Sequence, residues 1–251
     1  MTPVTLITGA SAGLGVDFAR QLAARGERVV LVARRKERLE ALVAELGNAR
    51  AVAVDLGEPG ATGRLMADLA AHGETVACLV NNAGFGLVGR FAELDGARQR
   101  SMIDLNIGAL TELAHAVLPG MIAAKKGSIL NVASTAAFQP GPGMAVYFAT
   151  KTFVLSFSEA LHEEVRGHGV RVTALCPGPT ATEFGEVAGW GGNAMIDKFS
   201  ASSPDVVRAG IAAMDKGCAI VIPGLVNKAG AQGHRLLPRW LLRKITGSIK
   251  L

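Results

Sequence analysis

The chain has 251 residues, a formal net charge of +5, 49% hydrophobic residues and 19% charged residues. This hydrophobic content excludes a disordered chain, and the length suits a single α/β domain. We expect neither a signal peptide nor a transmembrane helix, because no basic segment precedes an apolar one at the start and no run of ~18 apolar residues follows. The three cysteines lie far apart in apolar runs, which predicts core residues in a reduced, cytoplasmic protein.

Apolar runs of strand length alternate with amphipathic stretches of helix length. The expected strands cover residues 4–8, 28–33, 50–54, 76–80, 128–132, 170–176 and 219–222. The expected helices cover residues 14–25, 36–46, 61–72, 96–124, 145–167 and 204–215. Unbroken apolar strands that alternate with helices are typical of a parallel sheet covered on both faces. The pattern predicts one three-layer α/β domain over residues 1–251, with a doubly wound parallel sheet of about seven strands and ligands at the carboxyl ends of those strands.

A glycine-rich segment joins the first expected strand to the first expected helix. Gly9, Gly13 and Gly15 permit a tight turn and leave the N–H groups of the helix N-terminus open to a pyrophosphate. The same segment contains the G-x-S-x-G pattern of the α/β-hydrolase nucleophile elbow, with Ser11 at its centre. We disfavour a serine hydrolase, because its oxyanion donor must come from a loop upstream of Ser11, where the chain is too short.

Further short motifs follow the expected strands in a fixed order. They are Asp55, the run Asn-Asn-Ala-Gly at 81–84, Asn106, Ser134, Tyr147 with Lys151, and Pro177-Gly178. Together with the glycine-rich segment, this set resembles the short-chain dehydrogenase/reductase family over residues 3 to about 223. The resemblance implies a Rossmann fold, a nicotinamide cofactor, an oxidoreductase activity and a homodimer or homotetramer.

The resemblance also implies a catalytic set of Asn106, Ser134, Tyr147 and Lys151. Tyr147 and Lys151 are four residues apart, so they share one face of a helix, where the ammonium group, and the positive nicotinamide of the oxidised complex, favour the phenolate. Tyr147 would donate its proton to a carbonyl oxygen in reduction and act as the base in alcohol oxidation. By the same resemblance, Ser134 hydrogen-bonds the substrate oxygen, Lys151 holds the nicotinamide ribose, and Asn106 anchors a water that links the lysine to solvent.

The expected cofactor contacts lie along the ends of the strands. They are Gly9, Ser11, Ala12, Gly13, Leu14, Gly15, Arg34, Arg35, Asp55, Leu56, Asn82, Ala83, Gly84, Tyr147, Lys151, Pro177, Gly178, Thr180 and Thr182. NAD is usually recognised by an acid at the end of the second strand, where this chain has Ala33 followed by Arg34. A guanidinium can hold the 2′-phosphate of NADP, so we expect NADP rather than NAD.

The expected substrate pocket is mostly apolar. It comprises Phe85, Phe138, Gln139, Met144, Phe184 and Trp190. Such a lining favours a hydrophobic ketone, an aldehyde or the matching secondary alcohol. The segment 184–203 is rich in glycine and carries large apolar residues, which predicts a lid over the substrate.

The basic character of the chain is confined to its C-terminal part. Seven Lys and Arg residues and no acid follow Asp215, so the preceding part has a net charge of −2. In residues 225–251, a basic extension, these cations alternate with Leu and Trp. The extension can pack on a partner subunit or over the cleft, lie on an anionic membrane, or be a disordered tail.

Other functions find less support. The five histidines are scattered, so no metal site is expected, and the chain lacks a nucleic-acid-binding module. The main alternative is a non-catalytic, NADP-binding regulator on the same fold. The presence of both Tyr147 and Lys151 argues against it.

Overall fold

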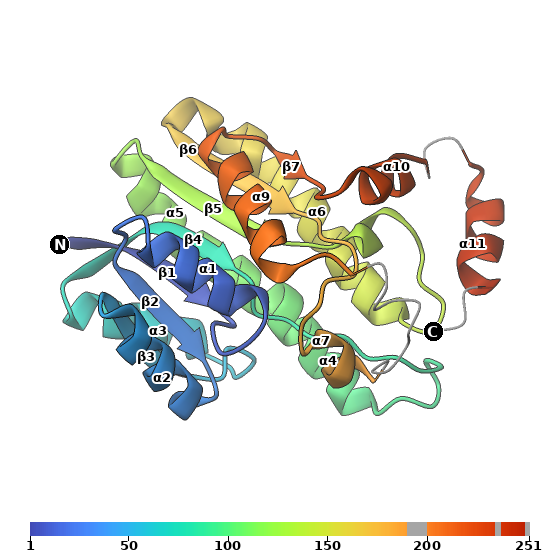
Figure 1. Cartoon of the computed structure of the whole chain (residues 1–251), viewed down its shortest axis with the longest axis horizontal. Helices are drawn as coiled ribbons and strands as arrows, with labels where there is room; N and C mark the ends of the chain where they lie inside the picture. The colour runs from blue at the N-terminus through green and yellow to red at the C-terminus, as the bar shows by residue number, and fades with distance from the viewer. Residues whose placement is uncertain (190–199, 234–236, 249–251) are drawn as a thin grey trace.

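A computed structural model describes residues 1–189, 200–233 and 237–248. Within them, seven parallel strands form one sheet in the order β3-β2-β1-β4-β5-β6-β7 (Figure 1). The strands are β1 (Thr2–Thr8), β2 (Val29–Ala33), β3 (Ala49–Ala53), β4 (Glu74–Asn81), β5 (Gly127–Val132), β6 (Val170–Leu175) and β7 (Ile220–Val221). The predicted fold is confirmed, and each expected strand is present within two residues at either end.

Helices join these strands and cover the sheet. They are α1 (Leu14–Ala23), α2 (Lys36–Leu46), α3 (Ala61–Ala71), α4 (Gly96–Ile103), α5 (Leu110–Ala123), α6 (Ala145–Val165), α7 (Phe184–Ala188), α9 (Ser203–Asp215), α10 (Leu225–Gly233) and α11 (Arg239–Ser248). A 3₁₀ turn, Thr135–Phe138, follows β5, and another, Arg166–His168, follows α6. The basic extension, residues 225–251, therefore contains two helices, α10 and α11. The interpretation of it as a disordered tail does not hold for these helices.

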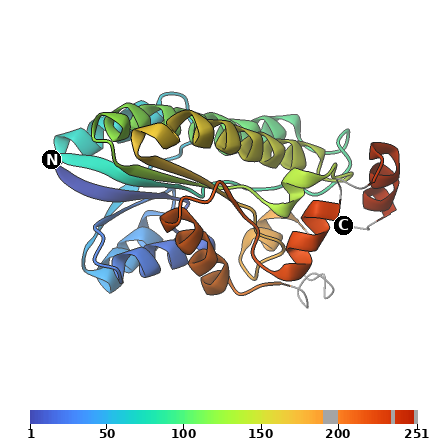
Figure 2. The same cartoon turned by 90° about the horizontal axis from the view of Figure 1, so that it is seen from above.

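Helices cover both faces of the sheet (Figure 2), and an apolar layer lies between the helices and the sheet on each face. On one face, α1, α2 and α9 bury residues such as Phe18, Leu39 and Ile211. On the other face, α3, α5 and α6 bury residues such as Leu65, Leu113 and Leu161. Strand β1 pairs with both β2 and β4, so the winding direction reverses there. Ligands bind at such a reversal, outside the carboxyl ends of the strands.

The helix expected over residues 96–124 is interrupted by a π-helical turn, Asp104–Ala109. The whole stretch Gly96–Ala123 is long and apolar enough to cross a membrane by length and composition alone. Its residues Leu113, Val117 and Met121 are instead buried against the sheet. The stretch therefore has the packing of a core helix, and the π turn adds one feature that the sequence pattern did not predict.

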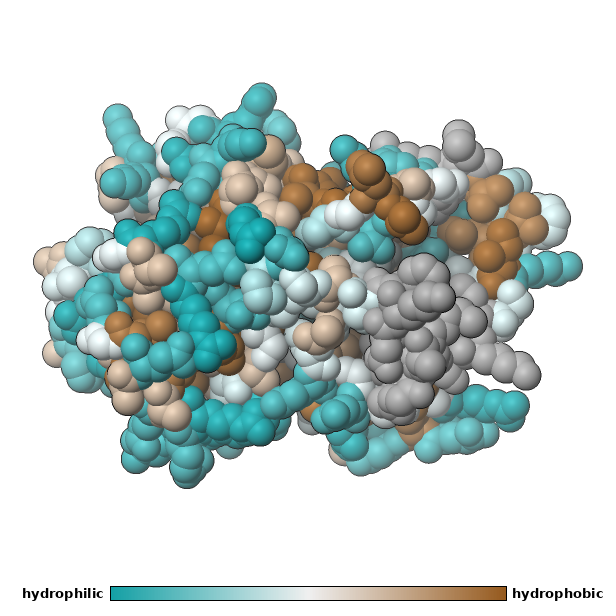
Figure 3. Space-filling view, in the orientation of Figure 1, coloured by the Kyte–Doolittle hydropathy of each residue, from teal (hydrophilic) through white to brown (hydrophobic). Residues whose placement is uncertain are grey.

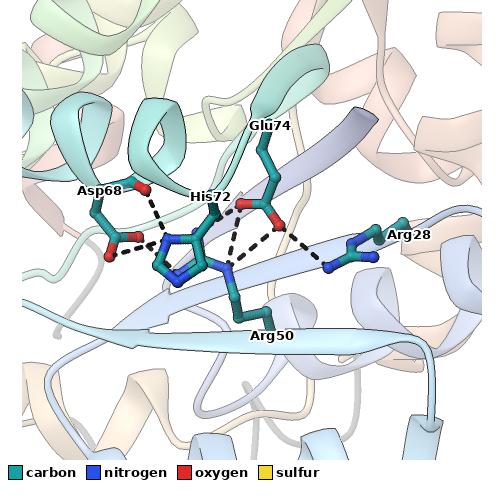
Figure 4. Close-up of polar contacts among 5 residues, drawn as sticks. All are labelled: Arg28, Arg50, Asp68, His72 and Glu74. Carbon is teal, nitrogen blue, oxygen red and sulfur yellow. Dashed lines mark hydrogen bonds and ion pairs between the residues drawn. The ribbon is translucent and has the colours of Figure 1, made fainter. Parts of the chain in front are cut away.

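A buried ion-pair cluster lies at the amino ends of the strands, opposite the expected ligand site (Figure 4). Arg50 of β3 contacts Glu74 of β4 with 2.6 Å between Nη2 and Oε2, and Asp68 of α3 with 2.7 Å between Nη1 and Oδ2. The Glu74 side chain is only 1% exposed, and Arg28 reaches it as well. The cluster joins β3, β4 and α3 at the amino ends of the strands.

One expectation, on the cysteines, needs correction, and another, on the lid, falls partly outside the described residues. Cys78 and Cys176 are buried as predicted, but Cys218 is exposed, because it lies in the turn between α9 and β7. The expected lid, 184–203, contains α7 and the start of α9, and its residues 190–199, with Trp190, lie outside the part that the structure describes.

Candidate active site

The glycine-rich segment between β1 and α1 is shaped by close backbone approach. Gly9 has φ +67°, and a Cβ there would lie 2.8 Å from the Asn82 amide nitrogen and 2.9 Å from the Ala83 Cα. A Cβ at Gly15 would collide with the Gly9 carbonyl oxygen. The segment therefore needs glycine at these positions. A loop that binds a pyrophosphate at the N-terminus of a helix such as α1 has the same requirement.

Thr8 connects this segment to the end of β4. Its hydroxyl accepts hydrogen bonds from the backbone N–H groups of Asn82, at 3.0 Å, and Ala83, at 2.9 Å. The Asn82 side-chain amide donates to the Thr8 carbonyl at 2.9 Å. The expected cofactor residues 82–84 are therefore held beside the glycine-rich segment. Sequence reasoning missed Thr8, although a polar residue at the end of an apolar strand was the available signal.

Three arginines gather at the end of β2. Arg34 lies 3.5 Å from Asp55, while Arg35 donates to the Ser11 hydroxyl at 3.1 Å and to its carbonyl at 3.2 Å. Arg38, one turn along α2, was not singled out from the sequence. The guanidinium of Arg38, and then that of Arg35, lowers the pKa of Glu183, which both contact. This gives a group of cations where the adenosine 2′-phosphate is expected.

The environment of Ser11 does not suit a hydrolytic nucleophile. Its hydroxyl oxygen accepts from the Arg35 guanidinium, which stays protonated and cannot take up the serine proton. This contact supports the choice of the phosphate-binding interpretation over the nucleophile elbow.

The pair Asp55 and Leu56 follows β3. One Asp55 carboxylate oxygen accepts from the Gly57 N–H at 2.9 Å and so shapes the turn. Leu56 is buried in the core layer that also contains Leu65. Both residues have structural roles here, and their expected contact with the cofactor stays a prediction.

Tyr147 and Lys151 lie one turn apart near the start of α6, and both are buried. The Lys151 Nζ is 5.8 Å from the centre of the Tyr147 ring and donates to the Val132 carbonyl at 2.8 Å. Burial lowers the pKa of Lys151 to about 8. Burial also raises the pKa of Tyr147 to about 12, while the hydrogen bond with Ser134 acts in the opposite direction.

The expected lowering of the Tyr147 pKa by the neighbouring ammonium is therefore wrong for the free chain. Desolvation of a phenolate among apolar side chains outweighs the favourable contacts. The lysine is directed to a β5 carbonyl rather than to the tyrosine hydroxyl. In this state Tyr147 is a firmly protonated phenol, which is the form that donates a proton to a carbonyl oxygen.

Ser134 lies between β5 and the turn that precedes α6. Its hydroxyl oxygen accepts from the Ala136 N–H at 3.1 Å, and the hydroxyl donates to the Pro177 carbonyl at 3.4 Å. Ser134 also shares a hydrogen bond with Tyr147. The structure therefore brings the expected serine and tyrosine together.

Asn106 occupies the π-helical turn and is 1% exposed. Its side chain accepts from the Phe85 N–H at 3.1 Å and donates to the Phe85 carbonyl at 3.0 Å and to the Thr150 hydroxyl at 3.1 Å. A Cβ at Gly84 would lie 2.9 Å from the Asn106 carbonyl oxygen and 3.7 Å from the Lys151 Nζ. Asn106 therefore holds the segment after β4 beside α6, and π turns occur often at functional sites. Its expected water stays a prediction.

The segment after β6 crosses the glycine-rich segment. The Thr182 side chain would be 3.1 Å from a Cβ at Gly13. Thr180 donates to the Gly178 carbonyl at 3.0 Å and forms a β-bridge with Ala201. A Cβ at Gly178 would collide with the side chain of Asn227, so α10 packs directly on the Pro177-Gly178 turn.

Apolar side chains surround Tyr147. The expected pocket residues Phe85, Met144 and Phe184 all pack in its cluster, with 5.3 Å between the ring centres of Phe184 and Tyr147. Leu87, another apolar residue of the expected pocket region, packs in the same cluster, while Met102 and Ala188 belong to it but were not singled out from the sequence. Phe138 packs instead in a cluster with Leu110, Ala133 and Val154, beside β5 and β6. Gln139 follows it at the end of the 3₁₀ turn.

The residues present fit a nicotinamide dinucleotide. The glycine cradle would take the pyrophosphate, the arginines after β2 the adenosine phosphate, and Tyr147 with Lys151 the nicotinamide ribose. Two observations support this fit. Gly9 and Gly15 leave space beside the backbone that any side chain would occupy, and the arginines gather at the end of β2.

Comparisons with known proteins agree with this geometry. Residues 3–189 match the family model described as short chain dehydrogenase. The NADP-dependent 3-hydroxy acid dehydrogenase of Salmonella typhi is 41% identical over 192 residues, which is 73% of this chain and 75% of the relative. A short-chain dehydrogenase from Sphingobium yanoikuyae in complex with NADPH is 33% identical, with a TM-score of 0.84 over 99% of this chain and 96% of that one.

A third relative is the bulky-bulky ketone specific alcohol dehydrogenase from Comamonas testosteroni. It is 28% identical, with a TM-score of 0.79 over 100% of this chain and 95% of that one. The family match covers most of the chain, and the fold and motif order agree with it. This chain therefore belongs to the short-chain dehydrogenase family of oxidoreductases.

Proposed function

We propose that this protein transfers a hydride between NADP(H) and a hydrophobic ketone or aldehyde, or the matching secondary alcohol, with Tyr147 as the general acid and base. The observation that carries the substrate class is the apolar cluster around Tyr147. The pKa of Tyr147 is shifted by burial and by the Ser134 hydroxyl, and neither cause involves a charged side chain. A site of this kind favours a neutral carbonyl compound over a carboxylate.

The choice of NADP rests on Arg34, Arg35 and Arg38. All three extend from the end of β2 or the first turn of α2, and each is partly exposed and charged. Guanidinium groups bind phosphates with several parallel hydrogen bonds. The NADP-dependence of the Salmonella relative and the NADPH in the Sphingobium structure support the same choice.

The side chains of this chain divide the chemistry as follows. Bound nicotinamide supplies or accepts the hydride. Tyr147, protonated in its apolar setting, donates a proton to the substrate oxygen in reduction and removes it in oxidation. Ser134, which hydrogen-bonds Tyr147, orients that oxygen, and Lys151 with its pKa near 8 can exchange a proton close to neutral pH.

A small hydroxy acid is the competing substrate class, since the Salmonella relative is a 3-hydroxy acid dehydrogenase. The structural match to a serine dehydrogenase complexed with NADP+ covers 87% of this chain, whereas the structural match to the bulky-ketone dehydrogenase covers 100% and so extends over α10 and α11. Helix α10 packs on the Pro177-Gly178 turn at the site. The shared C-terminal helices therefore support the bulky-ketone class.

Steady-state turnover with NADPH tests this proposal. The panel pairs apolar ketones and aldehydes with 3-oxo acids of similar size, and the reverse reaction pairs secondary alcohols with serine and 3-hydroxy acids. We expect kcat/KM to be at least tenfold higher for the neutral compounds. Equal or better turnover of the acids would overturn the substrate class. NADPH binding without turnover of any compound would favour the non-catalytic regulator.

We also propose a homo-oligomer formed through the outer face of α4 and α6. A shallow groove there is lined by Ile103, Ile107, Ala145, Val146, Ala149 and Thr150. Phe153 continues this face, is 38% exposed and stacks on Phe157. An isologous interface would place the groove against its own copy. A monomer in analytical ultracentrifugation at micromolar concentration would contradict this.

A further inference from the structure

The C-terminal helices carry cations without compensating acids. After Asp215 the chain has seven Lys and Arg residues and no Asp or Glu. Among the described residues, Lys228 lies on α10, and Arg239, Arg243 and Lys244 lie on α11. These four described cations lie on two helices at one end of the fold (Figure 1), whereas the chain up to Asp215 has a net charge of −2.

Large apolar side chains are exposed on the same helices. Leu225 and Val226, at the start of α10, are 86% and 83% exposed. Trp240 and Ile245 of α11 are 55% and 44% exposed. Figure 3 shows hydrophobic surface over α10 and over α11 on one face of the molecule. Large exposed apolar side chains grouped on two adjoining helices are typical of an interaction site.

These side chains are exposed because the helices use other faces to pack on the protein. In α11, Leu242 and Thr246 are buried, and a Cβ at Gly247 would lie 3.7 Å from the Pro142 ring. In α10, Ala231 is buried and Asn227 packs on Gly178. The outer faces combine Trp, Leu, Val and Ile with Lys and Arg, and the Lys244 Nζ lies 5.7 Å from the centre of the Trp240 ring.

We propose that the outer faces of α10 and α11 form a docking surface for an anionic lipid bilayer. Basic amphipathic helices with Trp and Leu bind in the plane of such a surface, where apolar side chains enter the acyl boundary and cations meet the anionic headgroups. A second copy of this chain fits less well, because an isologous contact would bring the same uncompensated cations together.

The docking surface borders the active site on two sides. Helix α10 contacts the turn that ends at Gly178, and α11 contacts the loop at Pro142, which precedes α6 and Tyr147. A protein docked through both helices would hold this end of the fold at the bilayer. The inference stands on charge and exposure, and it does not depend on the proposed substrate class.

Co-flotation with vesicles tests the proposal with the full chain. We expect binding to phosphatidylcholine vesicles that contain about one third phosphatidylglycerol, at least tenfold weaker binding to pure phosphatidylcholine, and weakening with added salt. Insertion is read from the fluorescence of Trp240 in a Trp190→Phe background, since the chain has only two tryptophans. A blue shift is expected with the anionic vesicles alone.

Two double variants and one matched control locate the contact. Arg243→Glu with Lys244→Glu removes the cations, and Leu225→Ser with Val226→Ser removes apolar side chains; each should weaken anionic-vesicle binding at least fivefold. Lys125→Glu with Lys126→Glu makes the same charge change in the exposed turn before β5 and should bind as the unchanged chain does. NADPH affinity reports that each variant is folded.

Three results would overturn the proposal. The first is a failure of the unchanged chain to bind anionic vesicles. The second is a control variant that loses binding as strongly as the α11 variant, which would reduce the effect to net charge. Self-association that is lost in the α10 and α11 variants, without vesicle binding, would instead assign these faces to a second copy.

Discussion

The carboxylate of Glu183 forms an ion pair with the guanidinium of Arg35, with 3.0 Å between Oε2 and Nη1. The same carboxylate holds Arg38 at 2.6 Å. The pair connects the segment after β6 to the first turn of α2, across the glycine-rich segment. The Glu183 carboxylate thus binds two of the arginines that we expect to bind the 2′-phosphate of NADP. The carboxylate and that phosphate therefore compete for the same guanidinium groups.

Removing the carboxylate should therefore sharpen cofactor preference. In Glu183→Gln, the Kd for NADPH should fall about two- to fivefold, the scale of an exposed ion pair, while the Kd for NADH stays unchanged. Fluorescence titrations with both cofactors measure this, with Glu186→Gln in the adjoining helix α7 as the control. If Glu183→Gln weakens both cofactors, the carboxylate acts by holding the segment in place.

Asn106 should be needed for stability as well as for activity. Asn106→Ala would leave the Phe85 N–H and carbonyl groups without their side-chain partner in a buried setting. Unsatisfied buried groups cost about 1–3 kcal/mol each, so we expect a loss of at least ~2 kcal/mol in the free energy of unfolding. Urea denaturation measures it. Asn48→Ala at an exposed position should change it by less than ~0.5 kcal/mol; a comparable loss in both would refute the assignment.

The ion-pair cluster of Figure 4 gives a second stability test. Arg50→Met leaves Glu74, at 1% exposure, without its nearest partner. Breaking a buried pair costs about 3–5 kcal/mol when no partner is left; because Arg28 still lies 3.5 Å from Glu74, we expect a loss of about 2–3 kcal/mol. The exposed pair of Arg100 and Asp104 is the comparison, since Arg100→Met should cost no more than ~1 kcal/mol. Similar losses in the two variants would show that burial of Glu74 adds nothing.

The buried lysine predicts a pH dependence of stability. Its pKa is about 8 in the folded chain and 10.5 ordinarily, so between these values the unfolded chain binds more protons. The free energy of unfolding should therefore rise with pH from about 8 to 10, relative to Lys151→Met. Above pH 10 the raised pKa of Tyr147 has the opposite effect, so the series ends there. A flat difference between the two proteins across this range would contradict the assigned burial.

The sequence predicted the fold well because the periodic signals are local. Apolar strands and amphipathic helices follow from spacing alone, and α2 has the bounds expected for it. The π turn at Asn106 was not predicted, since one extra residue in a helix leaves little trace in an apolar pattern. Cys218 was misplaced because an apolar neighbourhood in sequence does not reveal that a turn follows α9.

The candidate site was predictable where short motifs carry it, and less so where distant side chains meet. Ser134, Tyr147 and Lys151 were expected together and lie together. Thr8, Arg38 and Glu183 were missed, because their roles depend on contacts between segments up to 148 residues apart. The tyrosine pKa was misjudged for the same reason: desolvation depends on packing by Leu87, Met102 and Met144, which no local motif encodes.

The most direct test of the catalytic account is turnover by Tyr147→Phe, which removes one hydroxyl from a buried ring. With the best carbonyl substrate of the panel, we predict that kcat falls by about 10²–10⁴-fold, while the Kd for NADPH changes by less than about threefold. Turnover that survives in Tyr147→Phe at near the original rate would contradict the account, because proton transfer would then not pass through this residue.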